Sequence, residues 1–556
     1  MGSSRNNSFH VIVIGGGITG AGVARDCALR GLKVLLIEKH DLTHGASGRN
    51  HGLMHSGARY AVSDPENAVE CISENRILRR IARHCVEETD GLFISLPDDD
   101  LSYQQKFTQA CLNAGINAQI ISTREAIAIE PAVNPDIIGA VRVPDAAIDP
   151  FRLTMANILD AQAHGAQVIT HHAVTQILTS GTAVTGVVAT DSNGTDTEFH
   201  APIVVNAAGI WGQHIAGLAG ITLNMYPARG ALLIFGHRVN NMVINRCRKP
   251  SNGDILVPDD IVCVLGTTSD HVPIDKIDDT TVTSQEVDLL LAEGVKLVPR
   301  LARTRILRAY AGIRPLVASD NDDSGRDISR GIVCIDHAKR DGMDGFITIT
   351  GGKMMTYRLM AQQATDLVCR KLNVKVACTT AVTPLPGSEP IPEPDDDEEA
   401  APISFAHRAA QGRHGSLVSK IHDERPEQRA LVCECEHVST AEVNYAINEL
   451  HASSLARLRR RTRLGMGTCQ GKMCACRAAA LMADKDGAPE AHISDLNTFL
   501  NERWKGIRPV AWGTALSEAQ LSAMTYQSLC GMNLIQTDDL PKASPQTPSN
   551  PDSHEV

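Results

Sequence analysis

The sequence contains no long hydrophobic run. Its opening residues, MGSSRNNSFH, include no apolar segment of signal-peptide length, and the first apolar run is short enough to be one strand. Residues 201–228 lack Asp, Glu, Lys and Arg, but they include Pro202, Asn206 and several glycines. Because such residues disfavour a membrane helix, we expect a buried strand, a turn and a short helix there. The sequence therefore predicts a cytoplasmic protein, soluble or peripherally attached to a membrane.

An excess of positive charge is also absent. The chain carries 53 Lys and Arg against 64 Asp and Glu, and this net charge of -11 argues against a nucleic-acid partner. We find no internal repeat. With 43% hydrophobic and 21% charged residues, the 556-residue chain has the composition of a globular protein. Its length predicts about two to four domains.

Cysteine, by contrast, is abundant. Fifteen cysteines in a chain without an export signal indicate thiols, metal ligation or redox chemistry rather than a disulfide framework. Ten of them are scattered, such as Cys27, Cys71 and Cys263, and we expect these to be small buried hydrophobic residues.

Hydrophobic periodicity predicts an α/β beginning, with a strand at 10–14, a helix at 19–30 and a strand at 34–37. Further helices are predicted at 66–88, 151–164 and 354–371. Further strands are predicted at 167–174, 184–189, 202–206, 231–235, 261–266 and 345–350.

One segment marks a domain boundary. Residues 383–402 alternate prolines and then run through consecutive acidic residues, which predicts an extended, solvated linker. We therefore divide the chain into an oxidoreductase unit at 8–380, a cysteine-containing unit at 430–480 and a helical extension at 481–536. Residues 537–556 have the composition of a disordered tail.

The N-terminal motif VIVIGGGITGAG is typical of a dinucleotide site. Gly15 permits a tight turn, Gly17 lets the backbone approach a pyrophosphate, and Gly20 allows close contact between helix and strand. The start of the following helix presents free N–H groups and the positive end of its dipole to the phosphates. The next strand delivers Glu38, which is suited to bind both ribose hydroxyls.

This glycine motif does not distinguish NAD from FAD, but three later segments favour FAD. They are a Gly/Ser-rich loop at 44–60, a strand and small-residue turn at 204–212, and a strand–Gly–Gly–helix junction at 347–358. The helix at the last junction could stabilise negative charge on a reduced flavin. Besides Gly15, Gly17, Gly20 and Glu38, the residues expected to contact the cofactor are Lys39, Ser47, Asn50, Gly52, Val174, Ala208, Gly209, Gly351, Gly352 and Met354.

Together with HSGARY, AGIRPL and GGKMMTYR, these segments resemble the FAD-dependent glycerol-3-phosphate dehydrogenases of the D-amino-acid-oxidase-like superfamily. The resemblance covers about residues 8–380. It implies a Rossmann-like FAD-binding domain interleaved with a mixed-sheet substrate domain. It also implies oxidation of sn-glycerol 3-phosphate to dihydroxyacetone phosphate, with hydride passing from C2 to flavin N5.

A phosphorylated polyol requires several cations at one end of its site. The motif segments supply Arg59, Arg314 and Lys353, and Arg330 is a further candidate. Each could instead be a surface charge or part of a structural ion pair. Lys353, which follows two glycines at a helix start, could also contact the flavin or the substrate oxygen.

Oxidation of a secondary alcohol also requires a base for the hydroxyl proton. His55 is our first candidate, and Tyr60 lies in the same motif. Quinone-linked aerobic relatives carry a histidine a few residues beyond a Lys-Gly turn, but the similar segment here has Leu232 at that place. The resemblance therefore does not decide which group accepts the proton.

Two cysteine pairs, Cys433-x-Cys435 and Cys469-x4-Cys474, predict a metal site in the C-terminal unit. Four thiolates can bind zinc or an iron–sulfur cluster, but zinc ribbons favour C-x2-C spacing. The segment resembles the bacterioferritin-associated-ferredoxin-like [2Fe–2S] domain, a small, mainly helical fold. Cys476, close by, could be a spare thiol.

Between these pairs lies a basic run, RLRRRTR, at 457–463. It could be a solvated helix end, a counter-charge to the cluster, or a docking site for an acidic partner or anionic lipid.

The presence of both centres predicts a converter of two-electron to one-electron chemistry. Substrate would reduce FAD, and the flavin would release electrons singly through the cluster. The whole arrangement resembles the catalytic subunit of the anaerobic, multi-subunit enzymes of this family. That resemblance implies further flavin and iron–sulfur subunits that reach membrane quinone, with this chain peripheral on the inner face of the membrane. The alternatives are an FAD dehydrogenase for a 2-hydroxy acid or amine, and a non-enzymatic redox carrier.

Overall fold

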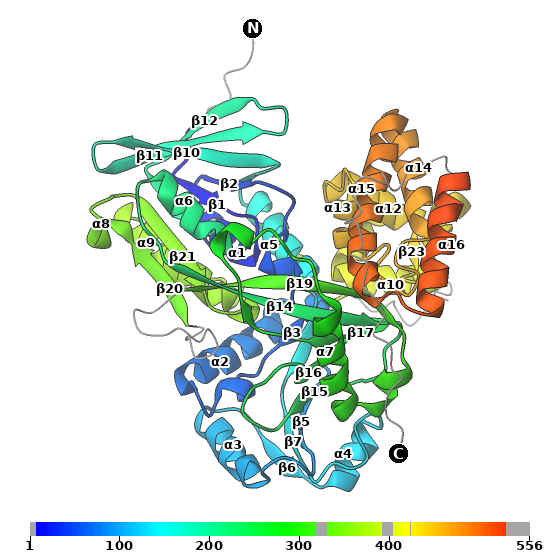
Figure 1. The fold of residues 1–556 in the computed structure, drawn as a ribbon. Coiled ribbons are helices and arrows are strands. Elements are labelled where there is room, and N and C mark those ends of the chain that lie inside the picture. Colours follow the sequence, from blue (N-terminus) through cyan, green and yellow to red (C-terminus); the bar gives the residue numbers. More distant parts are fainter. Residues whose placement is uncertain (1–6, 318–330, 392–403, 423, 530–556) are drawn as a thin grey trace, which may run out of the picture.

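A six-stranded sheet forms the centre of the first unit (Figure 1). The computed structural model describes residues 7–317, 331–391, 404–422 and 424–529. At its middle, β1 (Val11–Ile14) pairs in parallel with β13 (Ile203–Asn206) and β2 (Val34–Glu38). All four residues of β1 are buried, as expected for a strand covered on both faces. The outer strands are β9 (Gln167–Thr170), β21 (Phe346–Gly351) and the antiparallel β20 (Ile332–Asp336).

Helices and a second, smaller sheet cover the two faces of this sheet. The helices α1 (Ile18–Leu29), α5 (Pro150–Ala163) and α9 (Tyr357–Lys371) pack together on one face, where the side chains of Val11 and Val13 join their core. The other face meets a three-stranded antiparallel sheet and α6 (Gly212–Leu218). The strands of that sheet are β10 (His172–Ser180), β11 (Ala183–Asp191) and β12 (Asp196–His200).

A large mixed sheet lies beside this unit and is built from chain segments that alternate with those of the first sheet. The long strands β14 (Met225–Phe235) and β19 (Ile306–Val317) pair along most of their length and reach back toward the first sheet. Its other strands are β5 (Gly91–Ser95), β6 (Gln119–Ile121), β7 (Gly139–Val143), β15 (Val243–Arg246), β16 (Ile255–Asp259), β17 (Val262–Gly266) and β18 (Asp270–His271).

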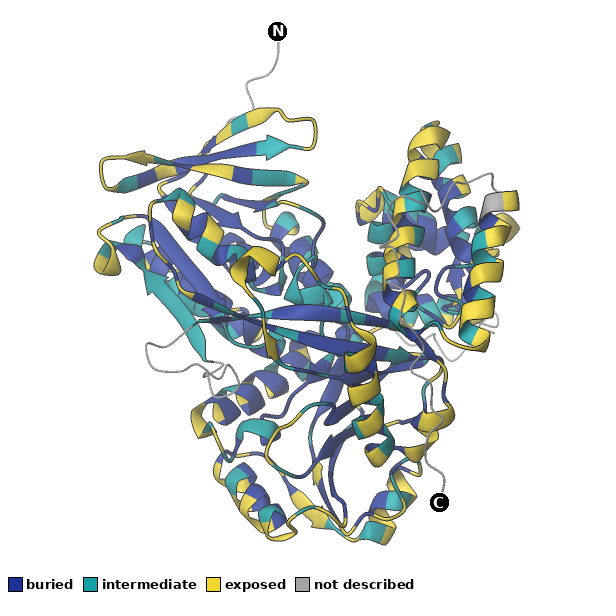
Figure 2. Cartoon of the chain, viewed as in Figure 1, coloured by how far each residue is buried: buried dark blue, intermediate teal, exposed yellow. Residues whose placement is uncertain are grey.

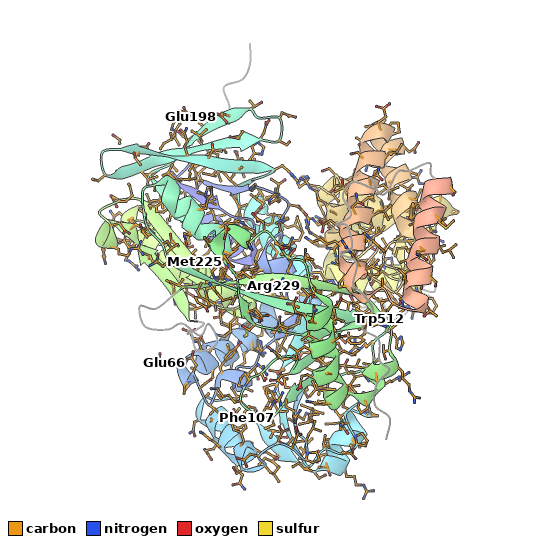
Figure 3. The ribbon with its side chains drawn as sticks, viewed as in Figure 1. Glu66, Phe107, Glu198, Met225, Arg229 and Trp512 are labelled. Atoms are coloured by element: carbon orange, nitrogen blue, oxygen red, sulfur yellow. The ribbon has the colours of Figure 1, made fainter. Side chains whose placement is uncertain are left out.

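The helices of this second part are α2 (Pro65–Ile81), α3 (Ser102–Asn113), α4 (Thr123–Ile129) and α7 (Ser284–Leu297). Phe107 of α3, labelled in Figure 3, packs on Phe93 of β5 with ring centroids 4.6 Å apart. A small sheet of β3 (Leu53–Met54), β8 (Ala146–Ile148) and β4 (Val86–Glu87) connects the two parts. The interleaved α/β arrangement is therefore confirmed.

Several predicted element bounds are wrong. The helix expected at 66–88 ends at Ile81, and the chain then forms a short 3-10 turn and β4. The strand expected at 167–174 is broken at His171, whose φ of 59° lies in the left-handed region. The helix expected from 354 begins with a 3-10 turn, Met354–Thr356, before α9. Periodicity does not detect such backbone breaks because they preserve the apolar pattern.

The predicted linker at 383–402 is also partly wrong. Leu385 is fully buried with Leu78 and Tyr357, and the carbonyl of Thr383 accepts a hydrogen bond from Arg25 at 2.9 Å. The segment up to Ser388 is thus packed onto the oxidoreductase unit, whereas residues 389–391 are exposed. The acidic run of the linker and the predicted tail at 537–556 lie outside the described residues.

The C-terminal unit is mainly helical, and Figure 2 shows buried and exposed residues alternating along its helices. A two-stranded ribbon of β22 (Leu431–Cys433) and β23 (Val438–Ser439) accompanies its helices. The helices are α10 (Phe405–His414), α11 (Pro426–Arg429), α12 (Thr440–Glu449), α13 (Leu455–Thr462), α14 (Cys474–Asp486), α15 (Pro489–Ile507) and α16 (Thr514–Leu529). Within the described ranges, no helix combines the length and apolarity that crossing a membrane requires.

Candidate cofactor, substrate and cluster sites

The turn between β1 and α1 leaves no room for side chains. Gly15 has a φ of 114°, and a Cβ there would lie 2.5 Å from the carbonyl oxygen of Ala207. A Cβ on Gly20 would lie 1.9 Å from the carbonyl oxygen of Gly15. Gly17 is the N-cap of α1 and has no side chain to occupy the space in front of the helix start. This is a cradle for a pyrophosphate.

We expect Gly20→Ala to weaken FAD binding by roughly ten- to a hundredfold, because the added methyl overlaps the backbone of the cradle. The measurement is the flavin absorbance per protein after purification. Gly217→Ala in α6 is the matched control, since a Cβ there meets no atom within 4 Å. Full flavin occupancy in Gly20→Ala would contradict the assignment of this turn to FAD.

Glu38 lies at the end of β2 and faces the cradle. Its carboxylate accepts hydrogen bonds from the backbone N–H of Gly16 at 2.6 Å and of His40 at 2.7 Å. Burial raises the pKa of Glu38 above its usual range, and these backbone donors oppose that shift. The neighbouring Lys39 is exposed.

The loop at 44–60 lies against the start of α1. The Ser47 hydroxyl accepts a hydrogen bond from the N–H of Ile18 at 3.0 Å. The Asn50 amide donates to the carbonyl of Ser47 at 2.8 Å and accepts from the N–H of Gly52 at 2.8 Å. The hydroxyl of Tyr310 in β19 donates to the carbonyl of Asn50 at 2.7 Å. Ser47, Asn50 and Gly52 thus form one rigid wall beside the cradle.

The remaining predicted cofactor residues are distributed over three places. Ala208 and Gly209 follow β13 and adjoin Gly15, whose added Cβ would lie 3.0 Å from the Cα of Ala208. Gly351 and Gly352 have φ values of 74° and 62° at the end of β21, and Met354 opens the next turn. Val174 is a buried residue of β10, and its side chain packs in a hydrophobic core. The predicted contact of Val174 with the cofactor therefore stays a prediction.

Three of the predicted substrate-site residues lie together. The ammonium Nζ of Lys353 is 4.5 Å from the centroid of the Tyr60 ring, a cation–π arrangement. The His55 ring packs edge-on to the Tyr60 ring, with 5.4 Å between the centroids. Asn67 of α2 accepts a hydrogen bond from Lys353 Nζ at 2.6 Å. No sequence signal marks Asn67, which occupies the first turn of an ordinary helix.

The predicted arginines have different surroundings. Arg314 extends from β19 to the loop after β17, where it donates to the hydroxyl of Thr267 and, at 3.2 Å, to the carbonyl of Thr268. Arg59 forms an ion pair with Asp254 at 3.4 Å, so part of its charge is already neutralised. Arg330 lies outside the described residues.

Two observations bear on the proton acceptor. Leu232 is buried in β14, with 1% of its surface exposed, and supplies no acceptor at the place where aerobic relatives carry histidine. His55 is 9% exposed, which leaves it close to the Lys353 and Tyr60 group with limited access to water. His55 therefore remains our candidate, and its role stays a prediction.

The four predicted metal-binding cysteines are brought together by β22, the turn after it, the loop before α14 and the start of α14. The thiol of Cys474 bridges to both Cys433 and Cys469, and Cys469 also contacts Cys435. A hydrogen bond from Cys474 and the N–H groups of Met473 and Gly471 lower the pKa of Cys469 to about 5. Backbone donors of this kind suit thiolates that bind a cluster.

Glycines allow this approach of backbone to sulfur. A Cβ on Gly467 would lie 2.5 Å from the Cβ of Cys435. Across the described residues, no group of three or more His, Cys, Asp or Glu side chains has the arrangement that a single metal ion requires. Four cysteines with N–H donors and no room for side chains fit an iron–sulfur cluster. Among the scattered cysteines, Cys27, Cys71 and Cys263 are buried as predicted.

The basic run at 457–463 is not a solvated helix end, and that interpretation is wrong. It forms α13 and its C-cap and lies between the two units. Arg460 and Arg461 bind the carboxylate of Asp41, at 2.6 and 2.9 Å, three residues after Glu38. Arg463, which is buried, binds Asp260 at 2.7 Å and Asp259 at 3.0 Å. These guanidinium groups join the units and are not free to bind an acidic partner or lipid.

We expect Asp41→Asn to lower the free energy of unfolding by about 3–5 kcal/mol, because it leaves buried arginines without their carboxylate. Burial acts to raise the pKa of Asp41, but Arg461, Arg460 and Arg457 outweigh it and hold that pKa low. The Asp41 carboxylate therefore makes its full contribution to the free energy of unfolding at pH values above the pKa that Asp41 has in the unfolded chain. That contribution is lost as the pH falls through the lower pKa of Asp41 in the folded protein.

Denaturant unfolding at neutral pH measures this effect. Asp98→Asn is the control, since that carboxylate pairs with Arg246 but is 67% exposed. Equal stability of the two variants would contradict a structural role for Asp41.

Comparison with known proteins places these sites in context. The family model described as FAD dependent oxidoreductase matches residues 10–358, and the BFD-like [2Fe-2S] binding domain matches residues 431–484. The chain is 58% identical over 540 residues to a subunit of the anaerobic glycerol-3-phosphate dehydrogenase of Escherichia coli (strain K12), covering 96% of this chain and 99% of the relative.

A more distant relative and a solved structure agree. One subunit of the anaerobic glycerol-3-phosphate dehydrogenase of Haloferax volcanii is 43% identical over 530 residues, covering 93% of this chain and 89% of the relative. The structure of the glycerol-3-phosphate dehydrogenase from Bacillus halodurans complexed with FAD has a TM-score of 0.67 at 22% identity, covering 92% of this chain and 97% of that one. The last likeness concerns the fold.

Proposed function

The chain belongs to the FAD dependent oxidoreductase family and carries a BFD-like [2Fe-2S] binding domain, and from this premise we propose that it oxidises sn-glycerol 3-phosphate to dihydroxyacetone phosphate. The observation that carries the proposal is the group formed by His55, Tyr60 and Lys353. In this group a cation, Lys353, and the candidate proton acceptor, His55, both contact Tyr60. The near full-length identity to subunits of anaerobic glycerol-3-phosphate dehydrogenases supports the choice of substrate.

The side chains divide the work between the two ends of the substrate. Arg314, supported by Thr267 and Thr268, and Arg59 bind the phosphate through charged hydrogen bonds. Lys353, fixed by Asn67, orients the hydroxyl group or the phosphate. His55 accepts the proton of the C2 hydroxyl, and its burial beside Tyr60 excludes bulk water from that proton.

The residues of the cradle, Gly15, Gly17, Gly20, Glu38 and Ser47, would hold FAD, which supplies the acceptor for the two electrons and the hydrogen of C2. Cys433, Cys435, Cys469 and Cys474 would hold a [2Fe–2S] cluster, which supplies a one-electron outlet. We further propose that other flavin and iron–sulfur subunits receive these electrons and pass them to membrane quinone. The relatives from Escherichia coli and Haloferax volcanii are each named as a subunit, which supports such partners.

Substrate-dependent dye reduction under anaerobic conditions tests the proposed activity. We expect glycerol 3-phosphate to support turnover. The amount of dihydroxyacetone phosphate formed should equal the amount of glycerol 3-phosphate consumed. Glycerol, which lacks the phosphate, should support little. Turnover with 2-hydroxyglutarate or an amine, and none with glycerol 3-phosphate, would contradict the proposed substrate.

A further inference from the structure

A cavity of about 680 Å³ opens between the oxidoreductase unit and the cluster unit. Its walls are the loop at 43–52, the middle of β19, and the facing surfaces of α13 and α15. In Figure 1, α13 and α15 stand at the side of the C-terminal unit that faces the oxidoreductase unit. Two residues of the wall beside the FAD cradle, Asn50 and Gly52, also line this cavity, but the function proposed above assigns no ligand to it.

The cavity differs from the FAD cradle. Ser47 points to the start of α1, whereas Gly48 and Arg49 line the cavity. A Cβ on Gly48 would meet the carbonyl oxygen of Thr43 at 2.3 Å and the ring of Phe151 at 2.9 Å. The loop at 46–48 is thus a closely packed partition between the two spaces.

Positive charge predominates in the cavity wall. Nine arginine and lysine side chains and six carboxylates line it. Some of these cations are neutralised: Arg152 pairs with Asp260, Arg460 with Asp41, and Arg463 with Asp259.

Four further arginines of the wall differ from these. Among the described residues, no carboxylate lies within ion-pair distance of Arg49, Arg308, Arg459 or Arg503. The Nε of Arg308 is buried and makes no hydrogen bond. Arg459 lies over the Phe151 ring at 5.8 Å, and Arg308 lies over the Tyr310 ring at 5.7 Å. Arg503 lies over the Phe499 ring at 4.9 Å and donates to the carbonyl of Gly465 at 2.8 Å and to the side-chain oxygen of Gln470 at 3.3 Å.

These four guanidinium groups also repel one another. Burial, and then the charges of Arg308 and Arg460, lower the pKa of Arg459 well below its usual value. Burial, and then Arg459 and Arg308, do the same to Arg503. Such an arrangement is unfavourable unless an anion occupies the space between the charges.

The negative groups near these arginines include the cluster cysteines for Arg503 and the carboxylate of Glu502 for Arg49, Arg308 and Arg459. Of the four arginines, only Arg503 has the cluster cysteines, Cys469 and Cys474, among the charges that act on it. The charges that shift the pKa values of the other three arginines include their own, that of Arg460 and that of Glu502.

We propose that this interdomain cavity binds a phosphate-bearing ligand of mononucleotide size, with its phosphate between Arg308, Arg459 and Arg503. One guanidinium group can donate two parallel hydrogen bonds to two oxygens of the same phosphate. The rest of the wall offers the rings of Phe151 and Tyr310 and the apolar side chains of Ile148 and Val264, which suit an aromatic base. The volume lies in the range of small-ligand sites and greatly exceeds the needs of a free phosphate ion. The proposal does not rest on the substrate proposed above.

Calorimetric titration of the holoenzyme, with FAD and cluster in place, tests the site. The probes are AMP, UMP and FMN, each beside its nucleoside without phosphate, and inorganic phosphate. We expect at least one mononucleotide to bind about tenfold or more tightly than its nucleoside and than inorganic phosphate. Arg459→Gln and Arg308→Gln should each weaken that binding by about tenfold or more. Arg300→Gln, at an exposed position outside the cavity, is the control.

Three results would overturn the proposal. The first is that no mononucleotide binds more tightly than its nucleoside. The second is unchanged binding in Arg459→Gln and Arg308→Gln at full FAD occupancy. The third is loss of FAD together with mononucleotide binding, which would assign the cavity to the FAD site. If the glutamine variants unfold, Arg459→Lys and Arg308→Lys preserve the charge, and the same criteria apply to them with a smaller expected loss.

Discussion

Replacing Arg314 with alanine is expected to lower kcat/KM for glycerol 3-phosphate by about 10- to 150-fold. This range corresponds to the loss of one charged hydrogen bond, about 1.5–3 kcal/mol. Arg314 is the predicted phosphate ligand with the best-defined support, since Thr267 and Thr268 fix its guanidinium group. Steady-state kinetics with an artificial electron acceptor measure the effect, which should appear mainly in KM.

Two further variants sharpen this test. Arg303→Ala removes the same charge from an exposed position at the end of a 3-10 helix and should leave kcat/KM unchanged. Asn67→Ala should release Lys353 and reduce activity less than Lys353→Ala does. An Arg314→Ala enzyme with wild-type KM and kcat would remove Arg314 from the substrate site.

Replacing Cys469 with serine is expected to abolish the iron–sulfur cluster. Cys469 is held by backbone donors, since the N–H groups of Met473 and Gly471 lower the pKa of its thiol. Anaerobically purified Cys469→Ser should lose iron and acid-labile sulfide together. Its FAD content and its activity with a dye that accepts electrons from flavin should persist, because the cradle lies in the other unit.

Cys476→Ser is the matched control, since Cys476 lies on α14 only two residues after Cys474. We expect it to retain iron and sulfide in equal amounts. Stoichiometric zinc without sulfide in the wild-type protein would contradict the cluster assignment, and loss of the cluster in Cys476→Ser would mean that the four ligands include Cys476.

The sequence predicted the features that depend on local constraints. The fold class and both cofactors are confirmed by the family matches. The glycine motif indicated the cradle because only glycine fits where a Cβ would lie 1.9 Å from a carbonyl oxygen. The cysteine pairs were recognisable because their spacing reflects a turn and a helix start. The identities of the substrate-site residues remain predictions.

Features that depend on tertiary contacts were not predictable. Asn67 supports Lys353 from a distance of 286 positions in the sequence, and nothing in its neighbourhood marks it. The basic run has the charge pattern of a surface helix, yet its partner Asp41 lies 420 positions away from Arg461. Leu385 has the same explanation: a proline-rich segment is usually solvated, but here it crosses a buried surface.

The central claim is that one chain passes electrons from glycerol 3-phosphate to FAD and then to a cluster held by four cysteines. The visible spectrum of the anaerobic wild-type holoenzyme, recorded before and after addition of glycerol 3-phosphate, tests it most directly. We predict that flavin absorbance decreases and that cluster absorbance decreases with it, whereas in Cys469→Ser only the flavin responds. An unchanged spectrum, or a bleached flavin beside a cluster that stays oxidised, would contradict the claim.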